Sequence, residues 1–432
     1  MTVRNGSIAA AVLAANLLWP PHATCQEEPG YFMWFAGARS SIHYSPPPWT
    51  STFLVRFEAI PLAPLVEITT LPGNRHLLVH EGPSTYYVYE RDTGAYLALP
   101  PLPLIPPRNW DYFRSNVVDQ EGELVVLPAG GSGNPDGIYR LGRDRQWSRI
   151  AALPGLSPRW FDRVLVDLET GDYVVSLNGL FRVRPWGATT TISGATLQVT
   201  AQDPETGGFL FWDQNYNPNY GYALNRITGT GTITTTGITW PPNVGYLPSL
   251  TVVDDRPTAW GEYVAVGVTT GTGAGSAIGR VSRWGGVVNV MARPGDICTS
   301  LILDRTRNLS TANDGARNRW RLFVDFPYDA GYPYACLVGA SGIRPGIRLA
   351  DGRNLRLNVD PLTLQGLAGT LPGFSGLMGR LDSTGAATGR IDLSSAGPAA
   401  RGIPFWVVGL VLDPGPPLSI RRVSPPIVVQ MR

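Results

Sequence analysis

The chain has 432 residues and a formal net charge of +2, so it is long enough for a large core and carries no basic surface suited to nucleic acid. Its 10% aromatic content excludes a disordered chain, and its 50 glycines and 39 prolines favour short strands with tight turns over long helices. Lysine is absent, which excludes Schiff-base chemistry.

The first 24 residues have the pattern of a secretory signal peptide. Arg4 precedes an apolar run from Ile8 to Trp19, and helix-breaking prolines and small residues follow it. The run is too short for a membrane span and no later segment offers one. We therefore expect a protein that is secreted or at the cell surface (periplasmic or extracellular). An alternative is a lipoprotein acylated at Cys25, although the usual leucine three residues earlier is missing.

A hairpin pattern then recurs along the chain: an apolar run, an aspartate, a short polar turn with glycine, and a second apolar run. "VVDQEGELVV" and "VLVDLETGDYVV" are clear copies, and a weaker early copy has Gly73 at its turn. An aspartate can accept hydrogen bonds from the backbone ahead of it, and glycine adopts positive φ easily. These residues are therefore interpreted as turn builders. The aspartates are Asp119, Asp167, Asp203, Asp254 and Asp304.

Each hairpin is followed by two further strand signals, which gives four antiparallel strands in about 45 residues, the size of a propeller blade. Six such units predict an all-β fold, a six-bladed β-propeller over residues 25–341. The last unit lacks a clear fourth strand. We expect residues 52–60 to close the ring beside the strands between Arg321 and Val338, because an unpaired edge invites aggregation.

The unit "VVDQEGELVV…GIYRLGRDRQWSRI" resembles the repeats of NHL-type and gluconolactonase-like six-bladed propellers, over roughly residues 60 to 340. The resemblance implies a divalent metal in the central tunnel, with a Glu ligand from an "EGP" motif on the first innermost strand. Here "EGP" is Glu81–Pro83, which follows "RHLLVH" at an expected hairpin turn. We therefore expect no metal site and no cofactor.

A second domain is expected over residues 342–432, where the regular hairpin signal stops. Its segments "RPGIRLADGRNLRLNVD" and "LDSTGAATGRIDL" resemble the C-terminal modules of large secreted bacterial proteins. Four or more strands in this stretch predict a small β-sandwich with a core of its own, separated near residues 341–345. One face of a strand should be buried through an alternating run of Phe405, Trp406, Val408, Leu410 and Leu412.

Two cysteines of the mature chain, Cys298 and Cys336, flank one repeat unit. They suit either a disulfide in an oxidising compartment or two buried free thiols, and the sequence leaves both open.

The richest polar and aromatic loop is "DQNYNPNYGY". Its candidate ligand-binding residues are Asp213, Asn215, Tyr216, Asn217 and Tyr220. Amide and hydroxyl groups there could bind a sugar, although Asn and Gly also simply build turns. The tryptophans at blade turns, such as Trp186, are interpreted as packing between blades.

No catalytic residue is assigned, because the sequence contains none of the common catalytic motifs and a mature chain would keep only three histidines, too scattered to share a metal. Two functions follow. The favoured one is a non-catalytic binding or cell-surface structural role toward an unknown protein or glycan ligand. The alternative is a propeller hydrolase, lactonase or carbohydrate-active enzyme with a central-tunnel site.

Overall fold

The structure is a computed structural model. It describes residues 31–36, 41–45, 52–56, 65–71, 75–80, 86–90, 96–100, 113–128, 137–142, 144–153, 163–203, 206–213, 222–240, 250–253, 263–269, 275–281, 287–294, 297–303, 308–314, 318–326, 329–349, 354–396, 402–415 and 419–431. The expected signal peptide and Cys25 lie outside these ranges. No helix within the described ranges has the length and apolarity needed to cross a membrane.

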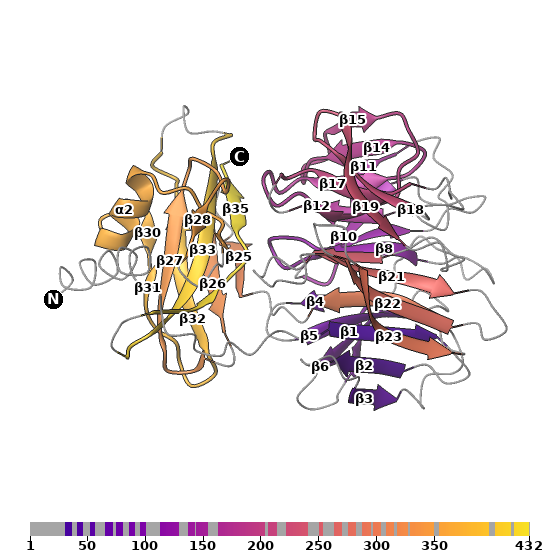
Figure 1. Ribbon diagram of the computed structural model, residues 1–432. Helices are drawn as coiled ribbons and strands as arrows, with labels where there is room; N and C mark the ends of the chain where they lie inside the picture. Colours follow the sequence, from indigo (N-terminus) through magenta and orange to yellow (C-terminus); the bar gives the residue numbers. More distant parts are fainter. Residues whose placement is uncertain are drawn as a thin grey trace.

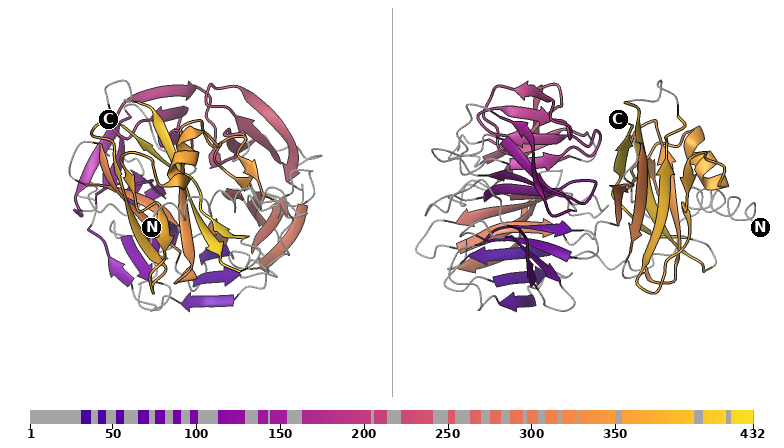
Figure 2. Two further views of the ribbon diagram at one scale, coloured as in Figure 1. Left: turned by 90° about the vertical axis from the view of Figure 1, so that its left-hand side faces the viewer. Right: turned by 180° about the vertical axis from the view of Figure 1, so that it is seen from behind.

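Six four-stranded antiparallel sheets form the chain up to Leu303. Five of them are built from consecutive strands, as the repeat predicts. The innermost strands β4, β8, β12, β16, β20 and β24 each contact the next, and β24 contacts β4 again, so the sheets form a closed ring. Figure 2 shows this ring around a central axis, and we call it the propeller.

The strands of these five sheets are β4 (Leu65–Leu71), β5 (Arg75–His80), β6 (Tyr86–Glu90), β7 (Tyr96–Ala98); β8 (Phe113–Val118), β9 (Leu124–Pro128), β10 (Gly137–Leu141), β11 (Trp147–Ala152); β12 (Arg163–Val166), β13 (Tyr173–Ser176), β14 (Leu180–Val183), β15 (Thr189–Ser193); β16 (Val199–Gln202), β17 (Phe209–Trp212), β18 (Tyr222–Ile227), β19 (Ile233–Trp240); and β20 (Leu250–Val253), β21 (Tyr263–Thr269), β22 (Gly275–Val281), β23 (Val287–Pro294).

The sixth sheet joins the two ends of the propeller. Its innermost strand is β24 (Ile297–Leu303), and β1 (Tyr31–Ala36), β2 (Ser41–Ser45) and β3 (Thr52–Arg56) follow outward. Three N-terminal strands thus complete this sheet, and β3 lies at its outer edge. The expected partner strands between Arg321 and Val338 belong elsewhere.

The rest of the chain forms a second body, which we call the C-terminal body and which lies against one face of the propeller (Figure 1). Its strands and helix are β25 (Leu309–Asn313), β26 (Arg319–Asp325), β27 (Pro333–Gly339), β28 (Ile347–Arg348), β29 (Asn354–Leu355), α2 (Pro361–Ala368), β30 (Phe374–Ser375), β31 (Met378–Arg380), β32 (Ala386–Asp392), β33 (Pro404–Asp413), β34 (Ser419–Val423) and β35 (Ile427–Gln430).

Two sheets of the C-terminal body enclose its main core. One has the order β25-β26-β32-β30, and the other has β31-β27-β33-β34 with β35 also paired to β33. Trp320 and Leu322 of the first sheet pack against Cys336 and Val407 of the second. On the opposite face of the second sheet, Trp406 and other residues of β33 pack with residues of α2 and the β28–β29 region.

Strand β33 is consequently buried on both faces. The sequence predicted one buried face for it, whereas both Val407 and Val408 are inaccessible to solvent. The physical reason is the additional layer formed by α2 and the β28–β29 hairpin, which covers the face that a two-layer arrangement would leave to water.

The strand pairing also differs from the expected division at residue 341. Strands β25, β26 and β27 were assigned to the last blade, but β26 pairs with β32 and β27 pairs with β33. The last repeat copy is therefore split: its first strand, β24, stays in the propeller and its second half enters the C-terminal body. The change of body falls between Leu303 and Leu309.

Candidate functional site

The repeated aspartates build turns, as the sequence predicted. Asp119 Oδ1 accepts hydrogen bonds of 2.9 Å from the backbone N–H groups of Glu121 and Glu123, and Asp167 Oδ1 accepts one from Glu169. The glycines of these turns have positive φ, 75° at Gly122, which a side chain would strain. We call the turns that begin at Asp119, Asp167 and Asp203 the Asp turns.

In the three sheets that carry the Asp turns, an arginine on the third strand pairs with a carboxylate of the turn. Arg182 lies 2.8 Å from Asp167, and Arg226 lies 2.7 Å from Asp203. In the sheet of Asp119, Arg140 instead lies 3.3 Å from Glu123. The three aspartates are buried, so these partners offset the cost of burying a charge.

Burial shifts the protonation equilibria around these pairs. It raises the pKa of Asp172 despite the nearby guanidinium of Arg182. Burial alone would lower the pKa of Arg140. The negative charges around it, above all those of ionised Tyr173 and of Glu123, outweigh burial and raise this pKa. Arg140 therefore stays a cation at neutral pH.

The Asp turns also connect neighbouring sheets. Tyr173 on β13 donates a 2.9 Å hydrogen bond to Asp119 Oδ2 of the preceding sheet. Gln202 Nε2 on β16 donates a 2.9 Å bond to Asp167 Oδ1, and the Gln202 side-chain oxygen accepts from the backbone N–H of Leu168. Each carboxylate thus holds its own turn and receives a donor from the next sheet.

The residues after two of these aspartates hold the C-terminal body. Gln120 Oε1 accepts a 2.6 Å hydrogen bond from the backbone N–H of Val428, and its carbonyl accepts from the N–H of Thr311. Glu169 pairs with Arg344, and its carbonyl accepts a 3.1 Å bond from Trp406 Nε1.

Two turn glycines permit this close approach. A Cβ at Gly171 would lie 2.9 Å from Val428 Cγ1, and one at Gly207 would collide with the Arg344 guanidinium. Three successive Asp turns therefore form one docking surface. We call the side of the propeller that carries it the Asp-turn face.

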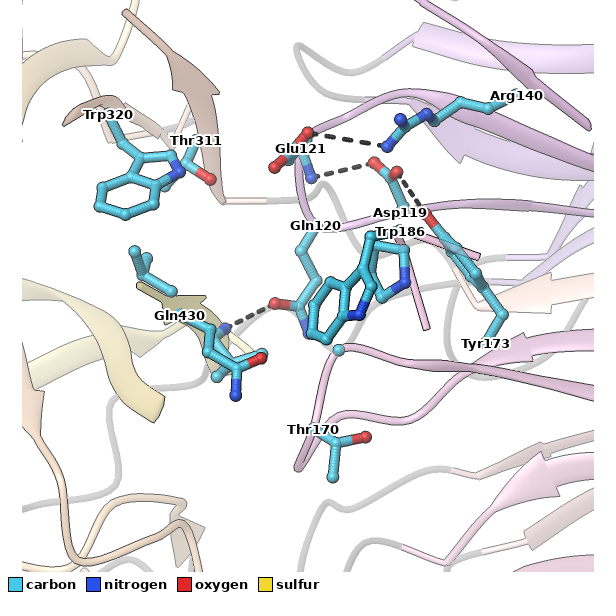
Figure 3. Close-up of a pocket in the computed structure, with 14 residues that line it drawn as sticks. Asp119, Gln120, Glu121, Arg140, Thr170, Tyr173, Trp186, Thr311, Trp320 and Gln430 are labelled. Atoms are coloured by element: carbon cyan, nitrogen blue, oxygen red, sulfur yellow. Dashed lines mark hydrogen bonds and ion pairs between the residues drawn. The ribbon is translucent and has the colours of Figure 1, made fainter. Parts of the chain in front are cut away.

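A cleft lies between the Asp-turn face and the C-terminal body. It consists of two cavities that share Glu121 and Arg140, a narrow one of about 50 Å³ and an open one of about 360 Å³. In the narrow cavity, Trp320, Thr311 and Gln430 face Glu121, Arg140 and Trp186 across the gap (Figure 3). Both bodies are needed to form it.

The tryptophan at this cleft differs from its sequence interpretation. Trp186 was expected to pack between blades, but it is 48% exposed. The Arg184 guanidinium lies 5.3 Å from its ring centre, and the side chain lines the narrow cavity. The turn between β14 and β15 presents Trp186 toward the C-terminal body.

Of the predicted binding residues, only Asp213 lies within the described residues. It directly follows β17, and its backbone N–H donates a 2.8 Å hydrogen bond to the carbonyl of Ala223. Asn215, Tyr216, Asn217 and Tyr220 lie outside the described ranges. In the parts of the chain that are described, no three His, Cys, Asp or Glu side chains are placed to hold a metal ion.

The disulfide that the sequence left open is not formed. Cys336 is a free thiol, buried in the core between the two sheets of the C-terminal body. Cys298 belongs to β24 of the propeller, so the two residues lie in different bodies. Burial raises the pKa of Cys336 to about 12.

Sequence reasoning missed the docking surface. Gln120 and Glu169 look like ordinary turn residues, and nothing local distinguishes them. A signal was available only for the ion pairs of the Asp turns. The third strands "IYRLG", "LFRVR" and "ALNRIT" each carry an arginine, which indicates a charged partner in each of these three turns.

No family model and no curated protein matches this chain. Solved structures do match. A virginiamycin B lyase from Staphylococcus aureus has a TM-score of 0.40 and 13% identity, over 69% of this chain and 92% of that one. Regucalcin, a calcium-binding protein from Agrobacterium tumefaciens, has 0.34 and 12%, over 60% and 81%.

A protein of unknown function from Bacteroides caccae has a TM-score of 0.43 and 10% identity, over 64% of this chain and 99% of that one. Each of these three matches covers most of the other protein's length. Their identities and TM-scores are too low to transfer an activity to this chain.

Proposed function

We propose that the chain is a secreted, non-catalytic recognition protein. The six sheets up to Leu303 are the complete set of blades of a six-bladed propeller, and the part from Leu309 is a β-sandwich-based module docked on it. The ligand, a protein or a glycan, binds the propeller face opposite to the Asp-turn face.

The position of the C-terminal body is the observation that carries this proposal. It contacts the turns between first and second strands, at Gln120 and Glu169. In an antiparallel sheet the next connection, between second and third strands, leaves from the other end. Strand β17 ends at Trp212 and β18 begins at Tyr222, so the loop between them starts and finishes at the end of the sheet away from the described C-terminal body, on what we call the uncovered face. That loop contains Tyr216 and Tyr220.

The use of the repeated carboxylates supports a non-catalytic role. Asp119 and Asp167 accept hydrogen bonds from their own turns and from the neighbouring sheet, and Asp203 pairs with Arg226. An acid or base in catalysis needs a proton-transfer path to substrate, which such fully engaged groups lack.

A glycan array and a partner pull-down from the native environment, both with the secreted chain, test the proposal. Tyr216→Ala combined with Tyr220→Ala should abolish binding at this face, read as the loss of the captured partner or of at least one arrayed glycan that the parent chain binds. Leu364→Ala, a substitution at a residue of the C-terminal body that is 56% exposed, should leave it intact. Metal-dependent lactone hydrolysis by the pure protein, abolished by one carboxylate substitution, would instead establish the enzymatic alternative.

A further inference from the structure

The cleft between the two bodies has the size and chemistry of a ligand site separate from the uncovered face. Its open cavity of about 360 Å³ falls within the range of roughly 300–1,000 Å³ that is typical of small-molecule sites. Its wall combines acceptors, at the carboxylates of Glu121 and Glu123, with donors, at the Arg140 guanidinium and the Gln146 amide.

The same wall disfavours other ligand classes. The wall of the open cavity carries three carboxylates but one cation, Arg140, so its net charge is negative and would repel an anionic ligand. The carboxylates are those of Glu121, Glu123 and Asp144. These carboxylates do not converge on a point, since no three described metal-binding side chains are placed to share an ion. An apolar ligand would leave the charged and amide groups of the wall without partners.

One donor in the adjoining narrow cavity has no acceptor. Gln120 uses its Oε1 for the docking bond to Val428, while its Nε2 is buried and makes no hydrogen bond to any residue that the structure describes. Gln120 lines the narrow cavity, in which an oxygen from water or from a ligand would satisfy that N–H group. The exposed Trp186 ring lines the same cavity and offers an apolar face.

We propose that this cleft binds a neutral carbohydrate. Sugar hydroxyls would donate to Glu121 and Glu123 and accept from Arg140 and Gln146, while a C–H face of the ring would pack on Trp186. Asn313 lines the open cavity from the C-terminal body. The site is composite, so the docked arrangement of the two bodies is part of its binding surface.

Titration calorimetry with the full chain tests the proposal, with maltohexaose, xylohexaose, cellohexaose and chitohexaose as neutral probes and an oligogalacturonate as the acidic probe. At least one neutral probe should bind saturably and the oligogalacturonate should not. Trp186→Ala should weaken binding about tenfold, and Asn313→Ala about fivefold. Ile233→Ala, at a side chain as exposed as Trp186 but outside the cleft, should not change the affinity.

Amide hydrogen exchange with the bound probe locates the site. Protection should increase at residues 120–123 and at residues 309–313, which belong to different bodies. If no neutral probe binds, or if binding survives both Trp186→Ala and Asn313→Ala, the proposal is wrong. Protection confined to residues 213–221 would also overturn it, and would support the uncovered face as the binding surface instead.

Discussion

Tyr173 Oη donates a hydrogen bond of 2.9 Å to Asp119 Oδ2, and this bond joins two neighbouring sheets of the propeller. The tyrosine is almost completely buried, and Asp119 is also engaged by two backbone N–H groups of its own turn. Asp119 thus stabilises its own turn and also binds the neighbouring sheet through Tyr173.

Tyr173→Phe should destabilise the protein by about 1–3 kcal/mol, because it removes a donor from a buried carboxylate. Urea unfolding of Tyr173→Phe, Asp119→Asn and the double variant measures the coupling, which should be at least about 0.5 kcal/mol. Strictly additive effects would show that the two side chains do not interact.

The same pair predicts alkaline behaviour. Burial raises the pKa of Tyr173 well above its ordinary value, and the charge of Asp119 raises it further. The folded state therefore holds the phenolic proton more tightly than the unfolded state does. Stability should fall as pH rises above about 10, the ordinary tyrosine value, and Tyr173→Phe should show a smaller fall. Equal pH profiles would contradict this assignment.

Gly171→Ala should cost about 1 kcal/mol or more, because its φ is 73° and the new Cβ would lie 2.9 Å from Val428 Cγ1. Gly194→Ala is the matched control, since Gly194 is exposed and a Cβ there would meet nothing within 4 Å. Its effect should stay within about 0.5 kcal/mol. Equal losses of unfolding free energy in the two variants would contradict the close approach of the C-terminal body.

The sequence was most informative where the interactions are local. The Asp turns could be predicted because an aspartate bonds to backbone groups two and four residues ahead of it. The docking bond between Gln120 and Val428 spans 308 residues, and no local pattern reports it. The assignment of the segment "LSTAN" (β25) to the propeller was wrong for a different reason. Its residues would suit a propeller strand equally well, and only its partner strand shows which sheet it joins.

The division between the bodies predicts which fragment folds. Residues 308–432 include β25, β26 and β27, which supply Trp320, Leu322 and Cys336 to the core. This fragment should unfold cooperatively in urea. A fragment of residues 342–432 lacks those strands and should not. Cooperative unfolding of the shorter fragment would restore the division at residue 341.

Cys336 should be inert in the native protein. Burial raises the pKa of its thiol to about 12, and the reactive species is the thiolate. Iodoacetamide at pH 8 followed by peptide mass spectrometry should find Cys336 alkylated only after denaturation. A Cys298–Cys336 disulfide peptide under non-reducing conditions, or native alkylation, would contradict the buried free thiol.

The docking of the C-terminal body on the Asp-turn face is tested most directly by amide exchange at Val428, whose N–H is bonded to Gln120 Oε1. Gln120→Ala should accelerate exchange of this amide about tenfold or more, because it loses its acceptor. Gln146→Ala, at an exposed glutamine of the propeller, should leave the exchange rate of Val428 unchanged. An unchanged Val428 rate in Gln120→Ala would show that the C-terminal body is not held on this face.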